Sequence, residues 1–130
     1  MESFSTGNIR NVVLVSHSGT GKTTLAEAML LTTGAVTRVG RVEDGNTTSD
    51  YEPEEAKRQT SVQTALIPCI WKDTKLNILD TPGYADFLGE MISGVRVADA
   101  AVIVVAAPSG VEVGTEILWQ QLEERGLPRL

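Results

Sequence analysis

The sequence predicts an α/β fold with a mixed, mostly parallel sheet, one antiparallel edge strand and helices on both faces. Residues 12–15 are a short, unbroken run rich in β-branched residues, and a glycine-rich turn and a helical stretch over 22–33 follow. A strand, a tight turn and a helix in this order open many α/β domains. Strand-like residues 62–71 and 76–79 are joined by so short a link that only an antiparallel pair is permitted. Residues 100–107, the most apolar run, predict the central strand.

Helical periodicity predicts which residues of the first helix face the core. Gly34 supplies the stop for this helix, since glycine is favoured just past a helix end. The residues that share one helical face in the stretch 22–33 are Leu25, Ala28, Met29 and Thr32. In the strand over 62–71, Pro68 lacks the backbone donor that a central strand needs, so we place this strand at a sheet edge.

Two more helices are predicted in the second half of the chain. The first covers residues 84–97, and the last ends at Arg125-Gly126 with Pro128 beyond it. After it, residues 127–130 look like the lead into another strand. The inward-facing residues are predicted to be Phe87, Leu88, Met91, Ile92 and Val95 in the first of these helices, and Val113, Ile117, Leu118 and Leu122 in the last.

The composition fits one globular domain. Hydrophobic residues make up 42% of the 130 residues and charged residues 22%, which excludes a disordered chain. The net charge of −6 excludes an intrinsic basic patch for nucleic acid. No apolar run approaches the ~18 residues of a membrane span, and the start lacks the basic residues of a signal peptide. With Cys69 as the single cysteine, we expect a cytoplasmic protein that has no membrane partner.

Residues 16–23 read S-H-S-G-T-G-K-T, which matches the phosphate-loop pattern GxxxxGK[ST] at every position except Ser16. Backbone N–H groups at the start of a helix can surround a phosphate, and the helix dipole favours its negative charge. In this pattern Lys22 reaches the β- and γ-phosphate oxygens and Thr23 gives its hydroxyl to Mg²⁺. The predicted nucleotide-binding residues here are Ser16, His17, Ser18, Gly19, Thr20, Gly21, Lys22, Thr23 and Thr24. The alternative is a chance glycine-rich turn. The sequence thus predicts a P-loop NTPase.

Residues 80–83, D-T-P-G, follow the strand that ends at Leu79. An Asp at the carboxyl end of such a strand can hold Mg²⁺, and a following N–H can meet the γ-phosphate. Asp80 and Gly83 are therefore predicted to join the nucleotide site. His17 occupies a free position of the phosphate loop, where a packing or backbone-orienting role competes with a catalytic one. Residues 35–61 show no periodicity, which is typical of a functional or mobile loop, and a domain linker is the alternative.

Taken together, these motifs resemble those of translational GTPases. The pattern H-x-x-x-G-K-T-T followed by D-T-P-G-x-x-D-F is present over residues 17–24 and 80–87. Residues 40–45, G-R-V-E-D-G, and 50–58, D-Y-E-P-E-E-A-K-R, narrow the resemblance to elongation factor G. It covers about residues 11–130 and implies a G domain that binds GTP or GDP with Mg²⁺, in a protein that engages the ribosome. It also implies that the guanine-reading N-K-x-D motif lies beyond residue 130, so that residues 1–130 are the amino-terminal part of the domain.

The resemblance also assigns a switch I region to about residues 35–61. By spacing, Ser61, not Thr60, stands where the family has the switch threonine that binds Mg²⁺, which gives Thr23, Ser61 and Asp80 as metal ligands. The family's histidine after D-T-P-G, which positions the attacking water, is replaced here by Tyr84. Lys22, Gly83 and Tyr84 are the expected catalytic residues. Both departures resemble elongation-factor-G-like paralogues.

These features leave three functional hypotheses. The first is an Mg²⁺-dependent GTPase that acts with the ribosome. The second is a nucleotide-dependent ribosome-binding switch with little or no hydrolysis, because Tyr84 replaces the histidine. The third, a P-loop ATPase of another kind, is disfavoured by the elongation-factor-like switch region.

Overall fold

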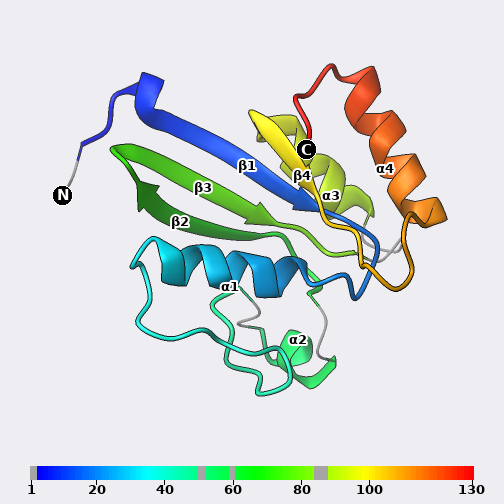
Figure 1. The fold of residues 1–130 in the computed structure, drawn as a ribbon, viewed down its shortest axis with the longest axis horizontal. Helices are drawn as coiled ribbons and strands as arrows, with labels where there is room; N and C mark the ends of the chain where they lie inside the picture. The colour runs from blue at the N-terminus through cyan, green and yellow to red at the C-terminus, as the bar shows by residue number, and fades with distance from the viewer. Residues whose placement is uncertain (1–2, 50–51, 59–60, 84–87) are drawn as a thin grey trace.

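The structure of the chain is a computed structural model that describes residues 3–49, 52–58, 61–83 and 88–130 (Figure 1). In these ranges the strands form one sheet in the order β2-β3-β1-β4. Strand β1 pairs in parallel with both β3 and β4, and β2 pairs with β3 in antiparallel fashion. This confirms the predicted mixed sheet with one antiparallel edge strand. The strands are β1 (Ile9–Val15), β2 (Ala65–Trp71), β3 (Thr74–Asp80) and β4 (Ala100–Ile103).

The antiparallel pair has the short link that the sequence predicts. Lys72 and Asp73 connect β2 to β3, and both have positive φ angles, 47° and 62°. Two such residues in a two-residue loop match the right-handed twist of the flanking strands. Pro68 lies in β2, at the edge of the sheet, where its missing N–H breaks no ladder bond to a further strand.

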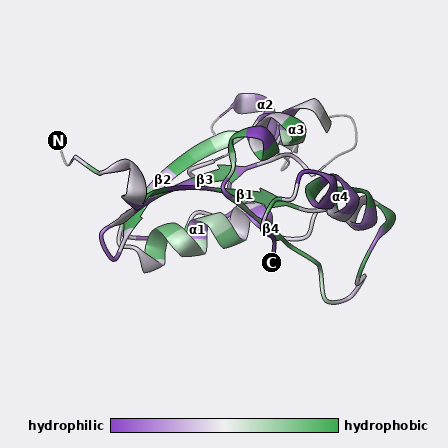
Figure 2. Ribbon diagram, turned by 90° about the horizontal axis from the view of Figure 1, so that it is seen from above, coloured by the Kyte–Doolittle hydropathy of each residue, from purple (hydrophilic) through white to green (hydrophobic). Residues whose placement is uncertain are grey.

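Helices cover both faces of the sheet, and α1 and α3 lie on opposite sides in Figure 2. Side chains of β1 alternate between the faces, as a strand requires. Val13 and Val15 pack with Met91 and Val95 of α3 and with Leu118 and Leu122 of α4, whereas Leu14 packs with Ala26 and Leu30 of α1. The helices are α1 (Lys22–Thr32), α2 (Pro53–Arg58), α3 (Leu88–Val97) and α4 (Val113–Glu124), and a 3₁₀ turn, η1 (Thr6–Asn8), precedes β1.

The predicted core face of α1 is partly wrong. Ala28 and Thr32 are exposed, while Ala26 and Leu30 are buried and Leu25 and Met29 are partly buried. The reason is where the helix begins, because the preceding loop turns Lys22 and Thr23 inward. Positions three, four, seven and eight residues further on then share that buried face. The loop, rather than hydrophobic periodicity, sets the rotation of α1.

A similar correction applies to α4. The sequence predicts that Val113 and Ile117 face the core, but their exposed fractions are 73% and 49%. A capping box between Glu112 and Thr115 fixes the first turn. It turns Thr115 inward, and Leu118 and Leu122 follow on the same face. Arg125 and then Gly126, with φ of 61°, end the helix as predicted.

Strand β4 has only four residues and lies at one end of the strand order, so the prediction of a central strand over 100–107 is wrong for the described strands. Its outer side is nevertheless paired. Ala101 N donates to Pro128 O at 2.9 Å, and Leu130 N donates to Ala101 O at 3.0 Å. Residues 128–130 therefore run alongside β4, as expected of the lead into a further strand.

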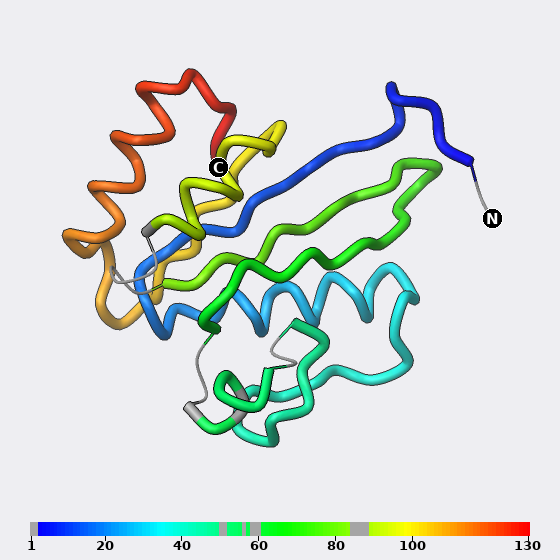
Figure 3. The backbone as a smooth tube through the Cα atoms, turned by 180° about the vertical axis from the view of Figure 1, so that it is seen from behind, coloured from blue at the N-terminus to red at the C-terminus, as the bar shows by residue number. Residues whose placement is uncertain are grey.

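The described residues of the segment 35–61 contain one short helix, α2, which the lack of periodicity in this segment does not predict. Elsewhere in its described part the segment has turns and bends but no strand. Figure 3 shows this segment running back along α1 before the chain enters β2.

Candidate functional site

The candidate site lies where β1 and β3 end. These strands are parallel neighbours, with Leu14 beside Asp80, so the loop after β1 and the loop after β3 leave the sheet at the same edge. The carboxyl ends of parallel strands are where open α/β sheets bind ligands. Gly19 and Gly21 in the first loop have φ angles of 74° and 94°, which glycine adopts without steric cost. The glycine spacing thus produces the tight turn that leads from β1 into α1.

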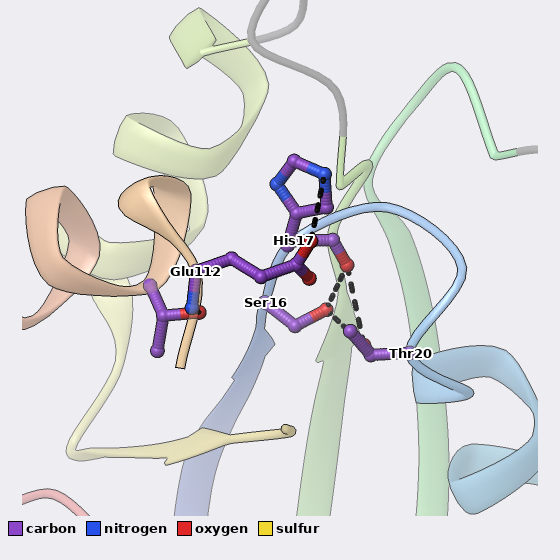
Figure 4. Close-up of polar contacts among 5 residues, drawn as sticks. Ser16, His17, Thr20 and Glu112 are labelled. Carbon is purple, nitrogen blue, oxygen red and sulfur yellow. Dashed lines mark hydrogen bonds and ion pairs between the residues drawn. The ribbon is translucent and has the colours of Figure 1, made fainter. Parts of the chain in front are cut away.

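The Ser16 hydroxyl makes several hydrogen bonds within the phosphate loop (Figure 4). Its hydroxyl donates to the carbonyl of His17 at 2.6 Å and accepts from the Thr20 hydroxyl. Lys22 Nζ also donates to this oxygen, at 2.7 Å. The serine that departs from the phosphate-loop pattern therefore ties the first loop residue to the lysine at its end.

Lys22 is buried, with 6% of its surface exposed, and lies against Gly83. A Cβ atom on Gly83 would come 2.7 Å from Lys22 Nζ and 2.8 Å from the Cα atom of Ser18. Contacts this short exclude a side chain at position 83. The loop after β3 thus approaches the phosphate loop so closely that only glycine fits.

The three predicted metal ligands lie together. Thr23 Oγ1 donates to Asp80 Oδ2 at 2.8 Å, and the same threonine oxygen lies 3.3 Å from Ser61 Oγ. Thr23 and Asp80 are buried, and Ser61 is partly buried. Next to Asp80, the buried Thr81 donates its hydroxyl to Leu14 O at 2.7 Å, which holds the loop after β3 against β1. Three segments far apart in the sequence meet at this cluster of oxygens.

This cluster fits Mg²⁺ by the chemistry of its donors. Magnesium prefers hard oxygen ligands, and it is usually bound by one or two carboxylates together with substrate phosphates and waters. Thr23, Ser61 and Asp80 supply two hydroxyls and one carboxylate. Over the described ranges no group of three or more His, Cys, Asp and Glu side chains comes together as a metal site. The donor set therefore suits an ion that also takes ligands from a bound phosphate.

His17 lies against the start of α4. Its Nε2 lies 3.9 Å from Glu112 Oε1, and Figure 4 shows the two side chains facing each other. A Cβ atom on Gly114 would come 2.8 Å from its Nδ1, so the ring packs against the start of α4. A packing role is one of those that the sequence predicts for this histidine, and the contact with Gly114 is of that kind. Of the remaining predicted residues, Thr24 is exposed at the start of α1, and Tyr84 lies outside the described residues.

Two buried glutamates, in and beside the predicted switch I region (35–61), are not predicted from the sequence. Glu27 of α1 has 1% of its surface exposed, and its carboxylate accepts from Gly40 N at 2.9 Å and from Thr48 N. A Cβ atom on Gly40 would come 2.5 Å from Asn46 O and 2.9 Å from Glu27 Oε2. Glu27 lies one helical turn after Thr23, so the helix that presents the threonine also holds the first half of the loop.

Glu55 of α2 has 2% of its surface exposed. Its Oε1 accepts from Val62 N at 2.8 Å and from Gln63 N at 3.1 Å, and its Oε2 accepts from Glu52 N at 3.3 Å. Buried carboxylates are found in proteins where donors satisfy them.

Comparisons with known proteins agree with this geometry. The family described as the elongation factor Tu GTP binding domain matches residues 7–130. The chain is 46% identical over 123 residues to an elongation factor G-like protein of Mycobacterium tuberculosis, covering 95% of the chain and 17% of that protein. It is 42% identical over 121 residues to the mitochondrial ribosome-releasing factor 2 of Candida dubliniensis, covering 93% of the chain and 15% of that protein.

Solved structures also match, among them the following two. One, from Thermus thermophilus, has a TM-score of 0.90 and 50% identity, over 94% of the chain and 18% of that structure's chain. The other, a bacterial selenocysteine-specific elongation factor EF-Sec, has a TM-score of 0.65 and 26% identity, over 82% of the chain and 16% of that structure's chain. The chain therefore spans less than a fifth of each of these relatives. With the phosphate loop, the D-T-P-G loop and the sheet all in place, the chain belongs to the family of elongation factor Tu GTP binding domains.

Proposed function

We propose that the chain binds GTP and GDP together with Mg²⁺, and that the full-length protein hydrolyses GTP as a ribosome-associated factor resembling elongation factor G. The observation that carries the proposal is the meeting of Thr23, Asp80 and Ser61 beside the buried Lys22. A hydroxyl at the start of a helix, an Asp after a strand and a hydroxyl from a loop are the parts that P-loop NTPases use around a nucleotide.

In this proposal the phosphate loop binds and orients the phosphates. Backbone N–H groups of residues 18–22 surround the β-phosphate, and the start of α1 adds a favourable dipole. Lys22 exchanges its bond to the Ser16 hydroxyl for the β- and γ-phosphate oxygens. Because Lys22 is already buried beside Gly83, it is held close to where those oxygens would lie. Catalysis then rests on positioning and charge, with little covalent work for the protein.

Thr23, Ser61 and Asp80 would hold the metal ion, Asp80 through a water molecule. When bound, Mg²⁺ neutralises charge that develops on the β- and γ-phosphate oxygens. Ser61 comes from the switch I region, so its contact would form only when a γ-phosphate orders this loop. The Gly83 N–H would meet the γ-phosphate from the other side, and Tyr84 would stand next to the attacking water.

A second function is favoured by the replacement of histidine with Tyr84. In that case GTP holds the protein in a ribosome-binding state, and hydrolysis is slow or absent. Both functions share the same nucleotide site, and they differ only in turnover. The names of the relatives, which include ribosome-releasing factors, support the ribosome as partner for either function.

The location of the protein is part of the same proposal. None of the helices in the described residues is long and apolar enough to cross a membrane. We propose the cytoplasm as the site of action, where the sequence places the chain, although some relatives are mitochondrial.

A turnover assay of the full-length protein separates these functions. Phosphate release from GTP would be measured with and without ribosomes, for the wild type and for Asp80→Asn. A GTPase should show turnover that ribosomes accelerate and that Asp80→Asn abolishes. Tight GTP binding without turnover on ribosomes would leave the switch function in place. Absence of GTP binding would contradict both.

A further inference from the structure

The contacts of Glu55 lead directly to the proposed metal site. Its Oε1 accepts from the backbone N–H groups of Val62 and Gln63, the two residues that follow Ser61. Its Oε2 accepts from Glu52 N, just before α2. This one carboxylate therefore binds the backbone just before the segment 53–61, at Glu52, and just after it, at Val62 and Gln63. Ser61 Oγ, one residue before the first bond, lies 3.3 Å from Thr23 Oγ1.

Glu55 is held firmly enough to transmit this constraint. It is 2% exposed, so its three bonds are not in competition with bulk water. The chain on the far side of the contact is also anchored, because Thr64 N donates to Glu90 Oε2 of α3 at 3.0 Å. Strand β2 begins at the next residue. Ser61 thus directly precedes three residues, 62–64, whose backbone N–H groups all donate to buried or partly buried carboxylates.

We propose that Glu55 is a positioning residue for the Ser61 hydroxyl: its carboxylate fixes the Val62 and Gln63 backbone and so places Ser61 beside Thr23. Glu55 makes no contact with the nucleotide in this scheme. It acts through Ser61 and determines how readily the switch I region delivers its oxygen to the metal in the GTP state. The effect of Glu55 on the metal site rests on the proposed function. The fixing of the Val62 and Gln63 backbone concerns the chain alone.

A first experiment tests the constraint without nucleotide. Amide hydrogen exchange at Val62 and Gln63 would be measured by NMR in the full chain for the wild type and three variants. Glu55→Asp keeps the charge but withdraws the oxygens by one methylene, and it should speed exchange at both amides by at least about tenfold. Glu55→Gln keeps a side-chain carbonyl that can accept from Val62 N and Gln63 N, but its NH₂ group cannot accept from Glu52 N, so it should restore most but not all of the protection. Glu124→Ala, at an exposed glutamate of α4, should leave these amides unchanged.

The amide of Val13 in β1 serves as the internal reference for folding. If Glu55→Asp speeds exchange at Val62 and Gln63 while Val13 stays protected, the local constraint is established. If the two amides in Glu55→Asp exchange as slowly as in the wild type, the proposal is overturned.

A second experiment tests the effect on the site by a double-mutant cycle. Mg²⁺ would be titrated into the chain saturated with a non-hydrolysable GTP analogue, and separately with GDP. Glu55→Asp should weaken Mg²⁺ binding about tenfold with the analogue and leave it nearly unchanged with GDP. Ser61→Ala should weaken it similarly, and the double variant should be no weaker than Ser61→Ala alone.

Additive effects in this cycle would mean that Glu55 does not act through Ser61, and equal weakening with GDP would contradict a role in the GTP state. A wild-type chain that binds neither nucleotide would contradict the proposed function instead. In that case hydrogen exchange still decides whether Glu55 fixes the backbone after Ser61.

Discussion

Thr23 Oγ1 donates a hydrogen bond to Asp80 Oδ2 at 2.8 Å, across 57 positions of the sequence. The bond joins the first helical turn after the phosphate loop to the end of β3, and both residues are buried. The same threonine oxygen lies 3.3 Å from Ser61 Oγ, so one hydroxyl contacts both the end of β3 and the loop that carries Ser61.

Gly83 should not tolerate a side chain. In Gly83→Ala the new Cβ would come 2.8 Å and 2.9 Å from the Ser18 Cα and N atoms, so the backbone of the phosphate loop has to shift. We expect a loss of about 1–3 kcal/mol in the free energy of unfolding, together with weaker nucleotide binding. Urea unfolding and nucleotide titration measure the two effects. Gly89→Ala in α3, where a Cβ meets nothing within 4 Å, is the matched control and should be neutral or slightly stabilising. Equal stability of both variants would contradict the close approach.

Glu27 should hold the first half of the predicted switch I region. Glu27→Ala leaves the Gly40 and Thr48 N–H groups without their acceptor, and we expect a loss of about 1–3 kcal/mol in unfolding free energy. Tryptic cleavage at the exposed Arg41 should also become faster. Glu124→Ala, at an exposed position of α4, should change neither quantity by much. An unchanged cleavage rate in Glu27→Ala would show that the carboxylate does not order this loop.

Much of this fold was predictable because local rules and global packing agree. The glycine spacing of the phosphate loop, Pro68 at the sheet edge and the short link at Lys72 and Asp73 each admit few structures. The faces of α1 and α4 were less predictable, because Val113 and Ile117 are as apolar as Leu118 and Leu122. Only the capping box, which depends on the path of the preceding loop, decides which of them face the core.

Some residues of the candidate site were likewise predictable from the sequence, and others were not. The predicted phosphate loop, Asp80, Gly83 and Ser61 lie together, because they belong to motifs with fixed spacing or follow adjacent strands. Glu27 and Glu55 escaped prediction because a glutamate in a single sequence is expected at the surface. Their burial depends on backbone N–H groups that a distant part of the chain brings to them, and no local pattern records this.

Cys69 should react with thiol reagents only when the chain opens. The side chain is 3% exposed, and burial raises the pKa of its thiol, an effect partly offset by a hydrogen bond with Thr33. A raised pKa means a smaller thiolate fraction at pH ~8 in the folded chain than in the unfolded chain. We expect labelling to be at least about 100-fold slower in buffer than in denaturant, which corresponds to an opening free energy of about 3 kcal/mol. Equal rates would contradict the packing of β2 against α1.

Tyr84 should limit hydrolysis on the ribosome. A phenol with a pKa near ~10 is neutral at physiological pH, so it cannot become the cation that the family's histidine can form. Its hydroxyl can still orient a water molecule, but its ring reaches further than an imidazole. We therefore expect the full-length protein to hydrolyse GTP on ribosomes more slowly than elongation factor G, and Tyr84→His to raise the rate. Single-turnover hydrolysis measures this, with Tyr84→Phe as the control that removes only the hydroxyl. A Tyr84→His variant no faster than the wild type would contradict the claim that Tyr84 limits hydrolysis.

The central claim is that the loop after β1 binds nucleotide phosphates, and the affinity of Lys22→Ala tests it most directly. Titration of a fluorescent GTP analogue in the presence of Mg²⁺ would compare this variant with the wild type and with Lys72→Ala, at an exposed lysine on the far hairpin. Loss of the positioned cation should weaken binding by about 10- to 100-fold in Lys22→Ala alone. Equal affinity in all three chains would contradict the assignment of the phosphate loop.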